Sequence, residues 1–475
     1  MKELKKYQVS FEQIYDFLPK KFHFLKEKEK ELEYKNIYAN KFMKEMFEYA
    51  LSLKKKVFLV SDMYYDENFI QSLLDKCGIK GYDKLYVSPT YNLTKHCGKL
   101  FELVFDELSY KKDEILHIGD NLLSDYEMPL RYGIKALQIP SVSSLFFDEY
   151  KLFKDFYAAN DNLSTSIILA LLIKKCLYDE KMSYYKYLGY FIGGPFIFAI
   201  ANFLVDEMQK RGLKDIFFIA RDGFLVKKVF ESILSVKKIN DIKTSYIVAN
   251  RSLNLLINLD LEKLNLNDNQ KKIQSLFYLL CEQDENFKDT YSYMKLDNKE
   301  QYNILLENKD LLENISHLNK KFYKKYLQNF DFSSDNIAIF DGNASTFSSL
   351  RLLKSMLKNK NIFAFYYNVG GDEKTRKSFP FCAYEGAVKI LNYPFSEFLM
   401  SANHYSKAYM KGENDFAENN DDFESAYKEL FSLIQEHEED FAKDMLDTFS
   451  NFKLEFDSEI IASYINFFLL NLSDR

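Results

Sequence analysis

The sequence predicts an α/β protein, and two features predict it. Short apolar runs alternate with segments of helical periodicity, which is the pattern of parallel sheets built from βαβ units. This alternation occurs twice, first between Lys56 and about Pro140 and again from Ile216 onward. Hydrophobic residues make up 47% of the 475 residues and aromatic residues 17%. The chain therefore has ample apolar material for two or three folded domains and is not a disordered chain.

The first α/β segment is preceded by helices. In residues 1–55, apolar residues recur at intervals of three and four, from Ile14 to Leu51, so this segment is expected to be a helical cap remnant without a strand. In residues 56–145, short apolar runs then alternate with segments of helical periodicity. Four apolar runs are the predicted strands of one parallel sheet: Val57–Val60, Leu85–Val87, Ile115–Ile118 and Ala136–Ile139.

The remainder of the chain predicts a second α/β domain. Ser, Asp and Asn concentrate before Ser166, so Ala158–Ser164 is the expected connection between domains. After a helical pair at Ile167–Arg211, residues 160–400 are expected to form the second domain, with a helical insertion at about 261–328 and an acidic helical region at 401–475. The predicted strands of this domain are Ile216–Ile219, Tyr246–Val248, Ile337–Phe340 and Ile362–Tyr367.

Composition excludes several classes of function. The 64 Lys and Arg residues against 70 Asp and Glu give a net charge of −6, and opposite charges are interleaved, so no general positive field is available for nucleic acid. The five cysteines lie far apart without CxxC spacing, which argues against a disulfide framework or a zinc site. The charged first residues do not resemble a signal peptide, so a cytoplasmic protein is expected.

A single stretch of the sequence, Tyr184–Val205, is apolar enough to suggest a membrane. Its 22 residues are long enough to span a bilayer, but they include Lys186 and a helix-breaking Gly193–Gly194–Pro195 sequence. We expect a pair of buried core helices there and no membrane span.

Polar residues follow three predicted strands of the first α/β segment, where ligands bind in parallel sheets. Ser61 follows the first strand, Lys95 lies beyond the second, and Asp120 and Asp125 follow the third. A hydroxyl and a lysine suit a transferring phosphoryl group, so Ser61 and Lys95 are candidate catalytic residues. Asp120 and Asp125 are candidate ligands for Mg²⁺, which binds one or two carboxylates with water and phosphate. Alternatively, the serine is a helix cap and the lysine is solvated.

The order of these residues resembles the haloacid dehalogenase (HAD) superfamily. Ser61 matches its second motif, Lys95 its third, and Gly119–Asp125 its fourth. Residues 10–140 most resemble large bacterial HAD-type proteins associated with surface polysaccharides, and the resemblance continues more weakly through Phe218–Gly223 and toward Phe398–Tyr409. The resemblance implies HAD-like hydrolase chemistry with Mg²⁺ on a sugar phosphate or nucleotide sugar, in capsule or lipopolysaccharide biosynthesis.

The chain departs from this family at the nucleophile. HAD phosphatases place two aspartates, separated by one residue, after a first buried strand, and the first aspartate forms an aspartyl-phosphate. No strand followed by such a pair precedes Lys56, and Glu12 and Asp16 have the wrong spacing. The chain is therefore expected to begin within the cap, and phosphatase turnover by the usual route is not expected. One alternative is a non-catalytic subunit whose partner chain supplies the missing strand.

The second α/β segment offers another candidate anion site. Arg221 and Asp222 follow one predicted strand, Arg251 follows another, and Asp341 and Asn343 follow a third, beside a Gly/Ser/Thr-rich helix start suited to phosphate. Alternatively, the neighbouring arginine and aspartate pair with each other or cap helices. A transferase that moves a sugar or phosphoryl group from this site is the main rival function.

Histidines support no other chemistry in the sequence. His96, His117, His317 and His404 lie far apart, and His117, inside an apolar run, is expected to be a satisfied core residue. The sequence contains neither a P-loop nor a GxGxxG motif, so a nucleotide-dependent dehydrogenase is not expected.

Overall fold

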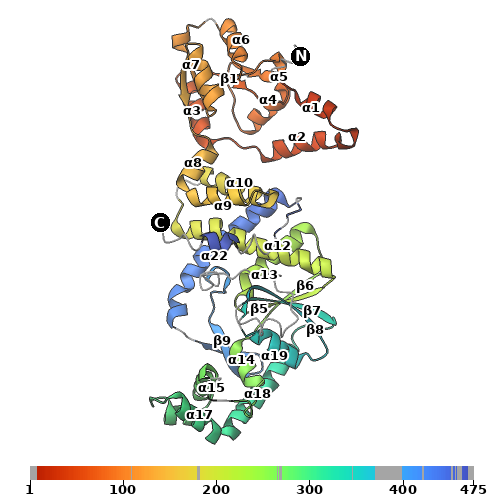
Figure 1. The fold of residues 1–475 in the computed structure, drawn as a ribbon, viewed down its shortest axis with the longest axis vertical. Helices are drawn as coiled ribbons and strands as arrows, with labels where there is room; N and C mark the ends of the chain where they lie inside the picture. Colours follow the sequence, from red (N-terminus) through yellow and green to blue (C-terminus); the bar gives the residue numbers. More distant parts are fainter. Residues whose placement is uncertain are drawn as a thin grey trace. The chain divides into compact units, whose positions relative to one another are not determined.

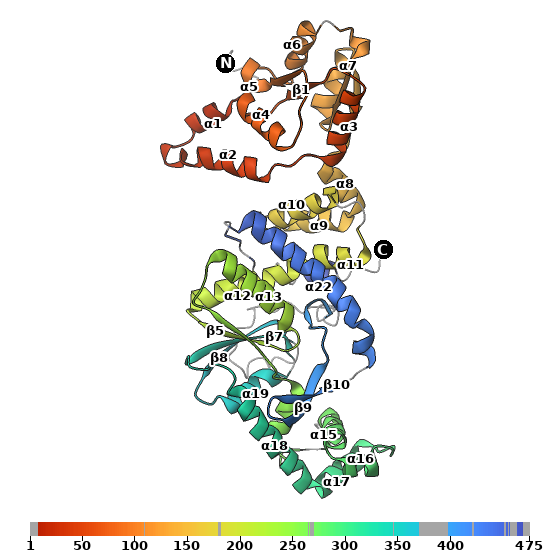
Figure 2. The same ribbon diagram turned by 180° about the vertical axis from the view of Figure 1, so that it is seen from behind.

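The computed structural model describes residues 8–108, 110–178, 182–264, 266, 270–344, 346–369, 398–419, 422–450, 453, 454, 456 and 463–468. It has mixed helices and parallel strands, as predicted (Figures 1 and 2). The chain divides into two compact units, Met1–Lys154 with Ile173–Glu180, and Asp155–Leu172 with Lys181–Arg475. Helices α9 (Lys151–Ala159) and α10 (Leu163–Tyr178) contain two of the division points, so the units divide within these helices and not at the expected connection Ala158–Ser164, which includes the loop 160–162 between them.

The first unit begins with helices. Within residues 8–57, the structure has α1 (Phe11–Phe17), a 3₁₀ turn η1 (Lys20–Phe22), α2 (Leu25–Asn36) and α3 (Lys41–Ser52), and no strand. Helix α1 starts at a capping box, in which Ser10 Oγ accepts the Gln13 N–H and Gln13 Oε1 accepts the Ser10 N–H. The helical prediction for this segment is confirmed.

The predicted strands of the first unit form two sheets instead of one. Strands β1 (Phe58–Ser61) and β2 (Lys84–Val87) pair in parallel, as do β3 (Leu116–Gly119) and β4 (Lys135–Gln138). Strands join one sheet only where their backbones approach to about 4.8 Å and exchange hydrogen bonds. Within the described ranges, β1 and β3 do not pair with each other, so the four predicted strands form two parallel pairs.

Short helices connect these strands. Helix α4 (Glu67–Lys76) lies between β1 and β2, and α6 (Lys99–Glu107) lies between β2 and β3. The remaining elements of the unit are α5 (Ser88–Tyr91), η2 (Lys112–Glu114), the π-helix η3 (Leu122–Glu127), α7 (Met128–Arg131) and α8 (Val142–Glu149).

The second unit contains a parallel sheet of four described strands. Their order is β6 (Lys243–Ile247), β5 (Asp215–Ile219), β7 (Asn336–Ala344) and β8 (Asn361–Val369). Helices α12 (Gly194–Arg211) and α13 (Gly223–Lys237) cover one face of the sheet (Figures 1 and 2). The opposite face is covered by three helices: α14 (Arg251–Ile257), α18 (Lys309–Leu327) and α19 (Ser348–Met356).

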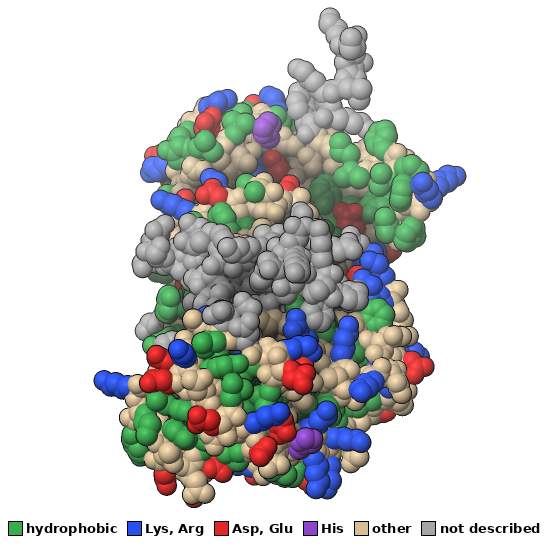
Figure 3. Space-filling model, turned by 60° about the horizontal axis from the view of Figure 1, so that its bottom comes forward, with side chains coloured by type: hydrophobic (Ala, Val, Ile, Leu, Met, Phe, Trp, Pro, Cys, Tyr) green, Lys and Arg blue, Asp and Glu red, His purple; other side chains and the backbone are tan. Residues whose placement is uncertain are grey.

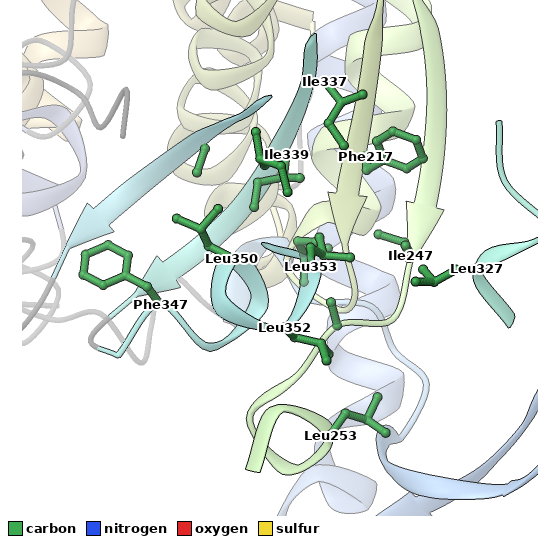
Figure 4. Close-up of a cluster of buried hydrophobic side chains, with 14 of the residues drawn as sticks. Phe217, Ile247, Leu253, Leu327, Ile337, Ile339, Phe347, Leu350, Leu352 and Leu353 are labelled. Atoms are coloured by element: carbon green, nitrogen blue, oxygen red, sulfur yellow. The ribbon is translucent and has the colours of Figure 1, made fainter. Parts of the chain in front are cut away.

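Burial on both faces explains why these strands read as continuous apolar runs. Phe217 joins the cluster that includes Leu253 and Leu350 on one side of the sheet (Figure 4). Phe218 points to the other side, where its ring meets Phe230 of α13 edge-on at 5.4 Å. Helices cover both faces at the centre of the sheet, so the central strands do not need to alternate apolar with polar side chains.

The apolar stretch near residue 190 is a core helix of the second unit. Helix α11 (Tyr184–Lys186), the π-helix η4 (Tyr187–Gly193) and α12 follow one another directly. This run is long and apolar enough to span a membrane, but 94% of its most apolar window is buried inside the structure. The prediction of a buried helix pair is confirmed in that respect.

Within the described residues, five helices lie between β6 and β7: α14, α15 (Gln270–Gln283), α16 (Glu285–Tyr291), α17 (Asn298–Glu307) and α18. The region 401–475, which is expected to be acidic and mostly helical, also contains two strands that were not predicted. An antiparallel hairpin of β9 (Ser406–Gly412) and β10 (Asp415–Asn419) precedes helix α22 (Asp422–Phe449). Asn414 adopts a left-handed φ of 64° in the turn, a conformation that asparagine tolerates and that closes the hairpin.

Candidate functional site

In the first unit, Lys95 links residues that follow β1 and β3. Its backbone N–H donates to Asp62 Oδ1 at 2.8 Å, and its Nζ lies 2.6 Å from Asp125 Oδ1. His117 Nε2 lies 2.9 Å from the same oxygen. The structure therefore brings Lys95 and Asp125 together, as the sequence predicts, and His117 is a satisfied, partly buried residue.

Asp125 is held ionised by its neighbours. Burial, which leaves 4% of the residue exposed, opposes ionisation. The hydrogen bond from His117 and the charge of Lys95 outweigh burial and hold the pKa of the Asp125 carboxyl well below its usual range. The second oxygen accepts the backbone N–H of Asn121 at 3.2 Å. Both oxygens of Asp125 are therefore already used by protein donors.

Asp120 and Ser61 do not contact the group formed by Lys95, His117 and Asp125. Asp120 is exposed, and Ser61 Oγ accepts the Met63 N–H at 3.2 Å. No group of three or more His, Cys, Asp or Glu residues is placed to hold a metal ion among the residues that the structure describes. Because Asp125 is bound to Lys95 and His117, these donors as they stand do not fit Mg²⁺, and the metal stays a prediction.

The second unit contains a cavity of about 460 Å³ beyond the carboxyl ends of β5 and β6. This edge is where ligands bind in open parallel sheets. The hairpin strand β9 and the residues before it complete the wall. The lining residues are Ala220, Arg221, Asp222, Val248, Asn250, Arg251, His404, Ser406 and Lys407.

The cavity wall is predominantly cationic. Its lining includes the cationic side chains of Arg221, Arg251 and Lys407 and one carboxylate, that of Asp222. The Lys407 ammonium also lies 2.6 Å from Glu418 Oε1, so part of its charge is already balanced. Arg251 is exposed at the start of α14, where Asn250 caps the helix by accepting the Leu253 N–H at 2.9 Å. Because the wall carries positive side chains and Arg251 is exposed to solvent, the cavity suits an anionic ligand.

Asp222 is positioned by residues distant in the sequence. Ser401 Oγ donates to Asp222 Oδ1 at 2.7 Å, and Gln435 of α22 donates to the Ser401 carbonyl oxygen at 2.6 Å. A side chain at Gly342 would place its Cβ 2.6 Å from Asp222 Cβ, so only glycine fits beside this carboxylate. These contacts hold Asp222 at the edge of the cavity.

His404 contributes a ring with a defined tautomer. Its Nδ1 lies 2.9 Å from the Tyr405 carbonyl oxygen, which can only accept, so Nδ1 carries the proton. In the neutral ring, Nε2 then accepts from the Tyr246 hydroxyl at 3.1 Å. Burial, and then the charge of Asp222, raises the pKa of Tyr246 well above its usual range, so its hydroxyl keeps the proton it donates.

The structure gathers some residues of the predicted second site and separates others. Arg221, Asp222 and Arg251 line one cavity. Asp341 is not among the lining residues, and its carboxylate accepts a hydrogen bond from Ser349 Oγ. The side chain of Asn343 lies outside the described part of the chain.

Sequence analysis missed His404 and Lys407. The polar run Asn403–Lys407 is a signal that could have indicated them, but strand β9, which begins within this run at Ser406, was not predicted. The hairpin is what brings this run to the carboxyl ends of β5 and β6, so a prediction without the hairpin could not place His404 and Lys407 beside the cavity.

No known protein-family model matches the chain, and no curated protein matches it. Its chemistry therefore has to be inferred from the geometry of these two sites.

Proposed function

We propose that the cavity of the second unit binds a phosphorylated carbohydrate, either a sugar phosphate or a nucleotide sugar. The observation that carries this proposal is the 460 Å³ cavity whose lining includes three cationic side chains and one carboxylate. Ligand pockets typically have volumes of about 300 to 1,000 Å³, so the cavity suits a small phosphorylated molecule.

The lining side chains divide into two chemical kinds. Arginine binds phosphate through paired N–H donors, so Arg221 and Arg251 are the proposed phosphate ligands. Asp222 and Asn250 offer acceptor oxygens and an amide of the kind that binds sugar hydroxyls. Within this proposal the chain is a cytoplasmic transferase of capsule or lipopolysaccharide biosynthesis. In a transfer from a nucleotide sugar, the acceptor hydroxyl oxygen would bond to the anomeric carbon as the bond from that carbon to the phosphate oxygen breaks. Asp222 would accept the hydroxyl proton, and the arginines would stabilise the departing nucleotide phosphate.

Isothermal titration of the full chain with pyrophosphate and with UDP-glucose tests the binding. Arg251→Met is expected to weaken both by about tenfold or more, because a charge-assisted phosphate contact is lost while the exposed position tolerates the change. Arg211→Met is the matched control, since Arg211 lies at the end of α12 outside the cavity lining. Equal affinities for the two variants, or no binding by the native chain, would contradict the proposal.

The first unit favours a second function, that of a HAD-like subunit completed by a partner. Strands β1 and β3 each bond to one strand only within the described residues, so each has an open edge. Their carboxyl ends are nevertheless tied together through Lys95, which contacts both Asp62 and Asp125. We propose that a strand from a partner chain bonds to these edges beside a phosphate site formed with Ser61 and Lys95.

This second proposal predicts that the purified chain alone does not hydrolyse phosphate esters. Within the described residues 8–57, no strand followed by two aspartates separated by one residue precedes β1, so a covalent phospho-enzyme is not expected. Turnover of p-nitrophenyl phosphate with added Mg²⁺ provides the measurement. Turnover by the chain that disappears in Asp120→Asn would show instead that the unit is a complete phosphatase.

A further inference from the structure

A group of exposed apolar side chains lies where α1 passes into α2 in the first unit. Phe17 and Phe24 are 85% and 74% exposed, which is unusual for phenylalanine. Three neighbours are also exposed, and together these side chains are called the α1–α2 patch: Phe17, Leu18, Phe22, Phe24 and Leu25. Figure 3 shows hydrophobic side chains gathered with lysines at this edge of the unit, at the upper right. Contiguous exposed apolar surface of this kind marks an interaction site.

Two exposed lysines, Lys20 and Lys21, lie within the patch. Lys26 at its edge pairs with Glu12, and the exposed acidic residues Asp16 and Glu27 flank the segment 17–26 on either side. The Lys21 ammonium lies 4.9 Å from the centre of the Phe22 ring. Cations and aromatic rings are therefore presented side by side.

Hydrogen bonds and an ion pair hold the patch in place from the other side. Tyr15 Oη of α1 donates to Glu29 Oε2 of α2 at 2.7 Å, and Lys26 pairs with Glu12. His23 Nε2 lies 3.0 Å from the Leu18 carbonyl oxygen, which closes the connection between the helices. The two helices are thus tied to each other while the aromatic side chains between them project outward.

We propose that the α1–α2 patch docks the chain on the surface of an anionic lipid bilayer. Aromatic and leucine side chains enter the boundary between headgroups and acyl chains, and neighbouring lysines bind anionic headgroups. A second copy of the chain would bring the same lysines against themselves, so like charges disfavour self-association through this patch. The proposal is independent of the function proposed for the second unit.

Co-sedimentation of the full chain with vesicles tests the docking. Binding is expected to vesicles of phosphatidylcholine with phosphatidylglycerol, and to be much weaker with phosphatidylcholine alone. The double variant Phe17→Ala/Phe24→Ala is expected to weaken binding to the anionic vesicles by about tenfold or more, because two inserting rings are removed. Lys20→Glu/Lys21→Glu is expected to weaken it similarly through charge.

The matched control is Phe42→Ala/Tyr49→Ala, which removes two aromatic side chains of α3 that are 58% and 66% exposed outside the patch. It is expected to bind like the native chain, and thermal unfolding checks that all variants are folded. Failure of the native chain to bind anionic vesicles, or equal losses in control and patch variants, would overturn the proposal. A change of oligomeric state in the patch variants without vesicle binding would assign the patch to a protein interface and also overturn it.

Discussion

Asp125 owes its ionised state to two neighbours that reach one oxygen. Its side chain is 6% exposed and that of Lys95 13%, so the pair is largely removed from water. Interactions in such surroundings are screened less than on the surface, and an unpaired charge there is costly. The three side chains come from separate segments, with Lys95 beyond β2, His117 in β3 and Asp125 in η3. Their pairing therefore stabilises the tertiary structure of the first unit.

We expect Asp125→Asn to lower the free energy of unfolding of the first unit by about 3 kcal/mol at pH 7. The pKa of Asp125 is lower in the folded chain than in the unfolded chain, so the folded chain binds fewer protons. This stabilisation is present above about pH 4 and is lost as the pH falls below it, so the difference between variant and native chain should shrink. Urea unfolding at several pH values measures the difference.

Glu31→Gln serves as the control for this variant, because Glu31 and its partner Lys28 are 64% and 52% exposed and such a pair contributes little. A destabilisation by Asp125→Asn that is the same at every pH would show that the charge of Asp125 is not its cause.

Helix α22 packs against the π-helix η4 at unusually short range, and a carboxylic acid lies in the contact. Glu438 of α22 is fully buried against Gly193, where no side chain larger than hydrogen fits. Within the part of the chain that the structure describes, neither carboxyl oxygen of Glu438 has a hydrogen-bond partner. Burial, and then the charge of Glu439, raises the pKa of Glu438 well above its usual range. Burial in the contact between the two helices therefore favours the neutral form of this acid.

Replacing this acid by an apolar side chain of similar length should stabilise the second unit. We expect Glu438→Met to raise the free energy of unfolding by about 1 to 3 kcal/mol at pH 8, since an unsatisfied buried polar group is removed. The raised pKa means that the folded chain binds more protons than the unfolded chain. The native chain therefore loses stability as the pH rises above about 4, and the gain should be smaller at pH 5.

Glu439→Gln is the neighbouring control, because Glu439 is about half exposed and pairs with Lys228 at the surface. No gain in Glu438→Met at pH 8 would mean that the Glu438 carboxyl is satisfied in solution, for example by water.

At the scale of the whole molecule, the chain is two compact units with separate cores. The cluster of Phe11, Tyr65 and Leu85 belongs to the first unit, and the cluster around Phe217 and Ile339 belongs to the second. Asp125 lies in one unit and Glu438 in the other. The two substitutions therefore probe different parts of the chain, and calorimetry of the full chain can assign each effect to its own unit.

Much of the fold was predictable because its causes are local. The runs at Val57–Val60 and Ile216–Ile219 predicted strands, since buried parallel strands need apolar side chains on both faces. The helices of residues 8–57 were predicted by apolar spacing of three and four. The hairpin at β9 and β10 was missed because its turn at Asn414 lies in an acidic, polar run that indicated only solvent exposure.

The candidate sites were predictable only in part. Residues directly after a strand, such as Arg221 and Arg251, were found because the carboxyl ends of parallel strands meet at one edge. His404 and Lys407 come from a segment more than a hundred residues away, and no local pattern places that segment at the sheet edge. Asp341 follows a strand in the same way but does not line the cavity, so position after a strand is not sufficient.

The sequence by itself determined the α/β class, the positions of the parallel strands and the residues that follow them, because these depend on the apolar or polar character of neighbours in the chain. Tertiary structure alone decided that the first four strands form two pairs, that Asp125 is in contact with Lys95 and His117, and that β9 completes a cationic cavity. The physical reason is distance in the chain. Hydrogen bonds, ion pairs and cavities involve segments that are far apart in the sequence, and local periodicity does not predict which segments meet. These contacts form only when the packed cores bring the segments together.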